Sequence, residues 1–490
     1  MRFNLKDYLK ISVLYTFASA FPALLQIFVL PVIEGEGRLN AIDFSQMAIA
    51  ESISTFVGTF ILFSMSGAIS RFYYDYLDNQ KGLNNLFSSV IIGILFRGLI
   101  IIGIAVAFGD YLASFFSQDS LNEFSSYGYG AIVIAINRAI IVVTTTLYRN
   151  QKFVTRFVLI NIALAITRTA GQLIGIFCFD MSFIGYVNGA AIGGGIITVI
   201  VILLVFKKCG VKFSRELIAP LTKFAFPLFV FELVKWGVLF ADRLFLESSP
   251  EQLGIYDNAQ RFAAGIYIIF QGLYGAVQPD FFLYLKKGVE NTIADLRRLS
   301  NIYLLQAQLS AILLIIPVIA YIYLFFETSL TTSGTLIAII FSQYIITALN
   351  TLFSMPIIFY KRTDIFLYIN LLVLATSLTI NYFLIPILGY YGAIIASYCA
   401  NTLQLALFIY IQNKIVKIKW NYHKTLTVPM SIVSCAIIAE LIKIYTNANY
   451  AIVAIMFVAV SLLILGFLYR NEIKNIIFKL KDKVIVQSNS

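Results

Sequence analysis

Charged side chains stand inside long apolar runs of this sequence. Arg97, Arg138 and Arg168 each lie about 13 or 14 residues from an end of such a run, which is mid-membrane for a helix that rises ~1.5 Å per residue. A charge at the bilayer centre costs at least ~2.5 to 3.5 kcal/mol, so these groups normally face a bundle interior or a wet cavity. Because a guanidinium fork suits phosphate and carboxylate groups, we predict an internal cavity with a cationic lining that binds an anion.

More charges fall in the apolar run 218–246 and in the run that follows it. Spacings of 3 and 7 residues place Glu232, Lys235 and Asp242 on one helix face, which we expect to face inward. Two interpretations stay open for these charges: ion pairs that hold helices together, or part of the cavity lining. The candidate substrate-binding residues are Arg97, Arg138, Arg168, Glu232, Lys235, Asp242, Arg243 and Arg261.

Two prolines lie inside apolar runs at corresponding positions. Pro22 belongs to the triplet Ala-Phe-Pro, which recurs at Pro227. Proline removes a backbone hydrogen bond and bends a helix, so both are candidate hinges, with a static kink as the alternative. The sequence before Pro22 imitates a secretion signal, but the apolar stretch continues through Val32, and we therefore expect a retained first helix whose polar face borders the cavity.

The apolar runs predict the fold. The chain has 490 residues, of which 60% are hydrophobic and 12% charged, and its mean hydropathy is +0.86. The runs are continuously apolar, which excludes the alternating pattern of a β-barrel. We predict an all-α polytopic membrane protein with about fourteen transmembrane helices. The spans are 8–33, 43–69, 84–107, 124–147, 155–178, 183–206, 218–246, 254–283, 299–325, 333–360, 364–388, 390–412, 425–445 and 449–470.

The distribution of the net charge of +11 indicates topology. Of the 36 Lys and Arg residues, 28 fall in connections on the side of the N-terminus, and only Arg38 falls on the opposite side. The excess of basic residues places both termini in the cytoplasm and predicts contact with lipid headgroups, with no role for nucleic acid.

Weak internal similarity predicts a duplication of six helices. Gly185-Tyr186 recurs as Gly389-Tyr390 at nearly the spacing of the proline triplets, and each half places a polar segment after its second span, at 71–85 and 285–299. We expect both segments to be short interfacial helices. Glycines at 185, 189 and 193 predict a close helix contact. The predicted parts are an N-terminal bundle 1–206, a cytoplasmic linker 207–223, a C-terminal bundle 218–412, an extra pair 425–470 and a cytoplasmic tail 471–490.

Several chemistries find no support in the sequence. There is no Walker motif, the four cysteines lack CxxC spacing, and the lone His423 lies in a cytoplasmic loop. No long external loop is present that could carry the catalytic groups of a polysaccharide polymerase. We therefore expect no enzyme activity, no metal and no cofactor, with coupling to H⁺ or Na⁺ left open.

The segment FADRLFLESSPEQLGIYDNAQRFAAGIYIIFQGLYGAVQPDFF, residues 240–282, resembles the Wzx-type O-antigen and capsule polysaccharide flippases of the MOP exporter superfamily, relatives of the MATE exporters and the lipid II flippases. The resemblance in span layout covers nearly the whole chain. The extra pair at 425–470 is a departure from many sugar flippases and is more similar to lipid II flippases.

The resemblance implies two six-helix bundles around a central cavity that opens to each side in turn. The implied substrate is an oligosaccharide on undecaprenyl pyrophosphate, part of O-antigen, lipopolysaccharide or capsule synthesis, moved to the outer leaflet of the bacterial inner membrane. The implied partners are a polysaccharide polymerase and chain-length machinery. A lipid II flippase and a MATE-like cation antiporter are the alternatives.

Overall fold

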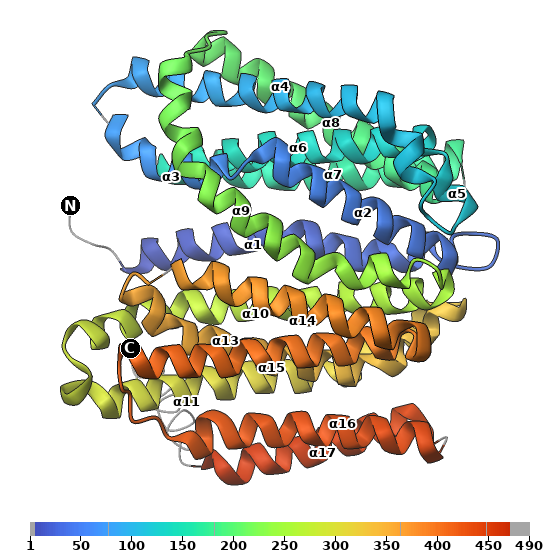
Figure 1. Ribbon diagram of the computed structural model, residues 1–490, viewed down its shortest axis with the longest axis vertical. Coiled ribbons are helices and arrows are strands. Elements are labelled where there is room, and N and C mark those ends of the chain that lie inside the picture. Colours follow the sequence, from blue (N-terminus) through green and yellow to red (C-terminus); the bar gives the residue numbers. More distant parts are fainter. Residues whose placement is uncertain (1–4, 77, 181, 363, 447, 471–490) are drawn as a thin grey trace, which may run out of the picture. The chain divides into compact units, whose positions relative to one another are not determined.

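The computed structural model is built of helices, as the apolar runs predict (Figure 1). It describes residues 5–76, 78–180, 182–362, 364–446 and 448–470, and within these ranges the only β pairing is an isolated bridge between Glu34 and Leu39. The α-helices are α1 Leu5–Ile33, α2 Ala41–Leu62, α3 Met65–Phe72, α4 Gln80–Ala113, α5 Asp119–Asn122, α6 Phe124–Asn150, α7 Val154–Ile174, α8 Phe183–Cys209, α9 Arg215–Leu246, α10 Pro250–Lys286, α11 Val289–Leu313, α12 Ile315–Phe325, α13 Ile337–Phe359, α14 Asp364–Leu388, α15 Tyr390–Ile415, α16 Val428–Thr446 and α17 Tyr450–Leu468. Short 3₁₀ or π segments are η1 Tyr73–Tyr76, η2 Gly175–Phe179, η3 Ser329–Leu336 and η4 His423–Thr427.

Twelve helical segments are long and apolar enough to cross a membrane in the part of the chain that the structure describes. The other two predicted spans are also helical. The first is α1, which contains an apolar stretch at Phe17–Ile33. The second is α10, which is 37 residues long but carries polar side chains such as Asp257 and Arg261. The predicted all-α membrane architecture is confirmed.

The two predicted interfacial helices are not separate elements, and that prediction was wrong. Segment 71–85 contains the end of α3, η1 and the start of α4, and segment 285–299 contains the end of α10 and the start of α11. The eight-residue helix α3 ends inside the first segment, and the long helices α4, α10 and α11 begin or end inside the two segments. Asn79 accepts a hydrogen bond from the backbone N–H of Gly82, and Gly288 adopts a φ of 95° between α10 and α11.

Packing divides the chain into two units. The first contains the described residues of 1–257 together with 327–330 and 378–393. Within it α7 and α8 lie side by side (Figure 1), in contact through glycines. A Cβ atom added to Gly189 would lie 2.1 Å from the carbonyl oxygen of Gly171, so only glycine permits this approach. The predicted close contact of the glycine face is confirmed.

The second unit contains residues 258–326 and 331–377, together with the described residues of 394–490. The helices α16 and α17, which fall in the predicted extra pair, lie beside each other (Figure 1). Tyr469, which is fully buried, donates a hydrogen bond to the carbonyl oxygen of Lys424 over 2.8 Å, so the end of α17 is joined to η4. The division into two bundles at 206 and 218 stays a prediction, and the predicted tail 471–490 lies outside the described residues.

Candidate substrate cavity

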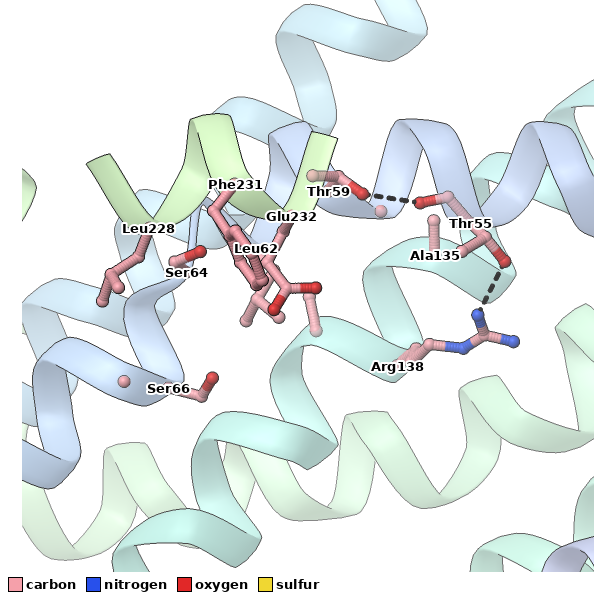
Figure 2. Close-up of a pocket in the computed structure, with 13 residues that line it drawn as sticks. Thr55, Thr59, Leu62, Ser64, Ser66, Ala135, Arg138, Leu228, Phe231 and Glu232 are labelled. Atoms are coloured by element: carbon pink, nitrogen blue, oxygen red, sulfur yellow. Dashed lines mark hydrogen bonds between the residues drawn. The ribbon is translucent and has the colours of Figure 1, made fainter. Parts of the chain in front are cut away.

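A polar cavity of about 430 Å³ lies in the first unit, among α2, α3, α6 and α9 (Figure 2). Four hydroxyl groups and two charged side chains line it, together with small and apolar residues. The lining residues are Thr55, Gly58, Thr59, Leu62, Ser64, Ser66, Gly67, Ala135, Arg138, Ala139, Leu228, Phe231 and Glu232. The hydroxyls were not among the predicted site residues, although Thr55 and Thr59 are one helical turn apart on α2.

Arg138 is the cation of this cavity and comes from the middle of α6. Its Nη1 donates a hydrogen bond to Thr55 Oγ1 over 3.0 Å (Figure 2), and its Nη2 lies 3.4 Å from Glu51 Oε1. The two charged side chains keep 37% and 42% of their surface exposed. The guanidinium is thus held by α2 and remains accessible, although Glu51 partly neutralises its charge.

Glu232 supplies the second charge of the cavity lining and projects from α9 (Figure 2). Its carboxylate lies 3.6 Å from Lys235 Nζ, one turn further along the same helix. Both side chains are about half exposed. These residues share a helix face, as predicted, and they form an ion pair at the edge of the cavity. The lining of this cavity is therefore mixed in charge rather than purely cationic.

Arg168 lies on α7 and borders a second, much smaller cavity of about 20 Å³. Arg138 and Glu51 line this cavity too, so it adjoins the larger one through a shared guanidinium. Two polar atoms at its wall, Arg168 Nε and Ser54 Oγ, are buried and have no hydrogen-bond partner in the structure. The space suffices for a single water molecule.

A polar network adjoins Arg168 and fixes the first helix. Gln26 of α1 donates hydrogen bonds to Thr169 Oγ1 over 3.3 Å and to Gln172 Oε1 over 2.8 Å, and it accepts one from Tyr186 Oη over 3.0 Å. Gln26 belongs to the polar face of α1, which was predicted to border the cavity. Its amide instead joins α1 to α7 and α8.

Arg97 lies in a different, apolar cavity of about 760 Å³. Its Nε donates a hydrogen bond to the carbonyl oxygen of Ile61 over 2.8 Å, and its guanidinium lies 5.8 Å from the ring centroid of Phe63. At this point α2 ends, because Phe63 and Ser64 both adopt left-handed backbone conformations with φ of 49° and 52°. Arg97 thus binds a free carbonyl at the C-terminus of α2, where a cation is favoured.

Arg243 is held in a buried ion cluster. Its Nε donates to Asp257 Oδ1 over 2.8 Å, and its Nη1 lies 3.4 Å from Asp242 Oδ1. Tyr256 Oη donates to the other oxygen of Asp242 over 2.6 Å. The arginine keeps only 14% of its side chain exposed, and Asp257 keeps 4%. These contacts support the interpretation that the charges are paired and join α9 to α10.

The remaining predicted residues are placed as follows. Arg261 lies on α10 in the second unit and is partly exposed. Pro22 and Pro227 lie inside α1 and α9, and both helices continue through them. Their action as hinges stays a prediction.

Comparisons with known proteins give the fold. No protein-family model and no curated protein matches the sequence. The structure of the lipid II flippase MurJ in an inward closed conformation is 18% identical, covers 94% of this chain and 100% of its own chain, and superposes with a TM-score of 0.66. A MATE structure in complex with MaL6 is 14% identical, with 83% and 96% covered and a TM-score of 0.56.

A MOP superfamily transporter from Pyrococcus furiosus is 15% identical, covers 84% of this chain and 96% of its own, and gives a TM-score of 0.54. These similarities extend over most of the described helices. Together with the twelve apolar helices, they show that the chain is a multi-pass helical membrane protein with the fold of the MOP-superfamily transporters.

Proposed function

We propose that the protein is a flippase that moves an oligosaccharide linked to undecaprenyl pyrophosphate from the cytoplasmic to the outer leaflet of the bacterial inner membrane. The observation that carries this proposal is the extent of the fold match. The lipid II flippase matches 94% of this chain, and the MATE structure matches 83% of it. The MATE chain itself is matched over 96% of its own length. This chain therefore contains a portion that the MATE structure lacks, and α16 and α17 are the candidate portion.

The chemistry of the polar cavity supports the same class of substrate. Arg138 offers charge-assisted hydrogen bonds to a diphosphate. The Thr55 hydroxyl accepts from Arg138 and can donate its proton to a phosphate or sugar oxygen, whereas the Thr59 hydroxyl donates to the Thr55 carbonyl oxygen and can accept from a sugar hydroxyl. The other charges near the cavity are Arg168 and Lys235, opposed by Glu51 and Glu232. Mixed charges and hydroxyls suit a molecule that carries both an anionic group and neutral sugar rings.

The membrane potential favours the proposed direction. With a negative cytoplasm, each negative charge carried outward gains ~2.3 kcal/mol per 100 mV. A diphosphate that crosses in the cavity is driven outward without ATP, and coupling to H⁺ or Na⁺ is a second source of drive. No catalysis, metal or cofactor enters this mechanism, in which the cavity opens to each side in turn, with Pro22 and Pro227 as hinges.

A second candidate function is export of organic cations, as in a MATE-like antiporter. The observation that favours it is the pair of carboxylates, Glu51 and Glu232, at the cavities around Arg138. Lipid II is the alternative lipid-linked substrate. Arg138 distinguishes the classes, because a cation exporter is helped by loss of this charge and a diphosphate flippase is impaired by it. A polysaccharide polymerase and chain-length machinery are the partners that we propose for the sugar flippase.

The test is surface glycan in cells that lack the chromosomal gene and carry a plasmid copy. We expect the wild-type gene to restore surface polysaccharide and Arg138→Gln to fail while the protein stays in the membrane. Arg71→Gln is the matched control, because Arg71 forms an exposed ion pair with Asp75 outside both cavities. Normal surface glycan with Arg138→Gln would contradict the proposal.

A further inference from the structure

The apolar cavity around Arg97 has the features of a lipid site. Eighteen residues line it, and sixteen of them have apolar side chains; the other two are Gly109 and Arg97. The rings of Phe56 and Trp236, from α2 and α9, meet with centroids 4.6 Å apart in its wall. Ile104 on α4 lines the cavity and is 52% exposed, so the space is open to a chain that enters along α4.

Arg97 gives this apolar space one polar feature. Its Nη2 is buried and has no hydrogen-bond partner among the residues that the structure describes, whereas Nε donates to the carbonyl oxygen of Ile61. A buried guanidinium nitrogen without an acceptor is unfavourable, and an anionic group beside it would remove that cost. Because lipid tails are as apolar as the cavity wall, an acyl chain gains little from moving out of the bilayer into this space. Selective occupancy therefore depends on an anion that reaches Arg97.

The helix α2 separates this cavity from the polar one. Thr55 and Thr59 face the polar cavity, whereas Phe56 and Phe60 face the apolar one. At the end of α2 the two linings meet in consecutive residues, since Phe63 belongs to the apolar cavity and Ser64 to the polar one. One amphipathic molecule with a phosphate at this break can place its chain on one side of α2 and its polar part on the other.

We propose that the apolar cavity binds the polyprenyl chain of the lipid carrier, with the phosphate bonded to that chain at Arg97 and the rest of the polar head directed to the polar cavity of Arg138. This proposal rests on the proposed flippase function and adds to it a separate site for the chain in the first unit. The occupant that we propose is the polyprenyl phosphate and not a bulk phospholipid. Both lipids have apolar chains, so the chain alone does not distinguish them. The site contains a single cation for the phosphate, and its aromatic walls pack against methyl-branched isoprene units.

Trp236 allows occupancy to be measured directly, because the chain contains only two tryptophans. In the full-length Trp420→Phe variant, Trp236 is the sole tryptophan. Phenylalanine conserves the ring contacts that Trp420 makes with Phe281 and Phe353 in the second unit. In nanodiscs of brominated phosphatidylcholine, bromine atoms that enter the apolar cavity quench Trp236. Added undecaprenyl phosphate, which carries no bromine, should restore the fluorescence in a saturable way.

Substitutions locate the effect. Ala105→Phe, which places a ring inside the apolar cavity, should reduce the recovery, whereas Ala170→Phe, in the exposed groove along α7 and α8, should leave it unchanged. Arg97→Ala should weaken apparent binding by roughly tenfold, and Arg97→Lys should retain part of it because the charge is kept. A Trp236→Phe protein that retains Trp420 should show no recovery.

Equal recovery with dioleoyl phosphatidic acid would overturn the proposal, since any anionic lipid would then fill the site. Recovery in Ala105→Phe that equals the recovery in the parent protein would overturn it as well. These outcomes are distinguishable from failure of the flippase function. If undecaprenyl phosphate protects Trp236 but surface glycan does not depend on Arg138, the lipid site is supported and the transport proposal is contradicted. If surface glycan depends on Arg138 but undecaprenyl phosphate does not protect Trp236, only the lipid site is contradicted.

Discussion

Arg138 Nη2 and Glu51 Oε1 lie 3.4 Å apart; Arg138 lines both the polar cavity and the small cavity of Arg168, whereas Glu51 lines only the small one. The Glu51 carboxylate partly neutralises the guanidinium. In the proposed flippase, a diphosphate at Arg138 would compete with Glu51 for this charge, and the ion pair would therefore weaken substrate binding and favour release.

Glu51→Gln tests this competition. Loss of the carboxylate charge should tighten binding of inorganic pyrophosphate to purified protein by up to about fivefold, because half-exposed ion pairs contribute ~0.2 to 1 kcal/mol. The measurement is retention of labelled pyrophosphate, and the Glu51→Gln, Arg138→Gln double variant should lose the gain. Equal affinity in the wild type and Glu51→Gln would show that Glu51 does not compete.

Arg243→Ala should destabilise the fold strongly. Removal of the arginine leaves Asp242 and Asp257 buried without their cation, which costs ~3 to 5 kcal/mol. Thermal unfolding in detergent should show a large loss, whereas Arg71→Ala, which removes an exposed pair, should change stability by less than ~1 kcal/mol. An Arg243→Ala protein as stable as the wild type would instead favour a role in substrate binding.

Gly189→Leu should prevent the packing of α7 on α8. Even a Cβ atom would lie 2.1 Å from the backbone oxygen of Gly171, so the helices must separate. Gly103→Ala on α4 is the control, because nothing lies within 4 Å of the added atom, and it should stabilise its helix by about 0.5 to 1 kcal/mol. The yield of monodisperse protein on size-exclusion chromatography reports both effects. Normal behaviour of Gly189→Leu would contradict the close contact.

Glu34→Ala should open the loop between α1 and α2. The buried Glu34 carboxylate accepts hydrogen bonds from the backbone N–H groups of Glu327 and Thr328, at 3.0 and 2.7 Å. Loss of bonds to a charged group costs ~1.5 to 3 kcal/mol, so trypsin cleavage after Arg38 should accelerate about tenfold or more. Glu36→Ala should leave the rate unchanged, since only the backbone N–H of Glu36 bonds to Glu327. Equal cleavage rates in both variants would argue against a role of the Glu34 hydrogen bonds in holding the loop.

The sequence was sufficient to predict the membrane-spanning helices and the close packing of the glycine face. Long continuous apolar runs predicted the helices, and the regular spacing of Gly185, Gly189 and Gly193 predicted close packing, because both signals are local and repeat along the chain. The end of α2 was missed, since the two residues with left-handed backbone, Phe63 and Ser64, are not glycines and stand inside an apolar run. The predicted interfacial helices at 71–85 and 285–299 were wrong because polarity alone does not mark the ends of a helix.

The site was harder to predict because its contacts join distant parts of the chain. Arg138 and Glu51 are 87 positions apart, so their pairing depends on how α2 packs on α6. The packing of α4 on α2 places Arg97 in an apolar cavity, away from the lining that contains Arg138. Identical residue types in similar mid-helix positions thus have different surroundings, which the spacing of charges along one chain does not reveal.

The most direct test of the central claim is transbilayer movement in proteoliposomes. Purified protein is reconstituted with a fluorescent oligosaccharide linked to undecaprenyl pyrophosphate, and a reductant outside the vesicles bleaches the label in the outer leaflet. We predict that wild-type protein makes both leaflets accessible and that Arg138→Gln slows this movement by roughly tenfold or more. No movement with the wild-type protein, or movement at the wild-type rate with Arg138→Gln, would contradict the account.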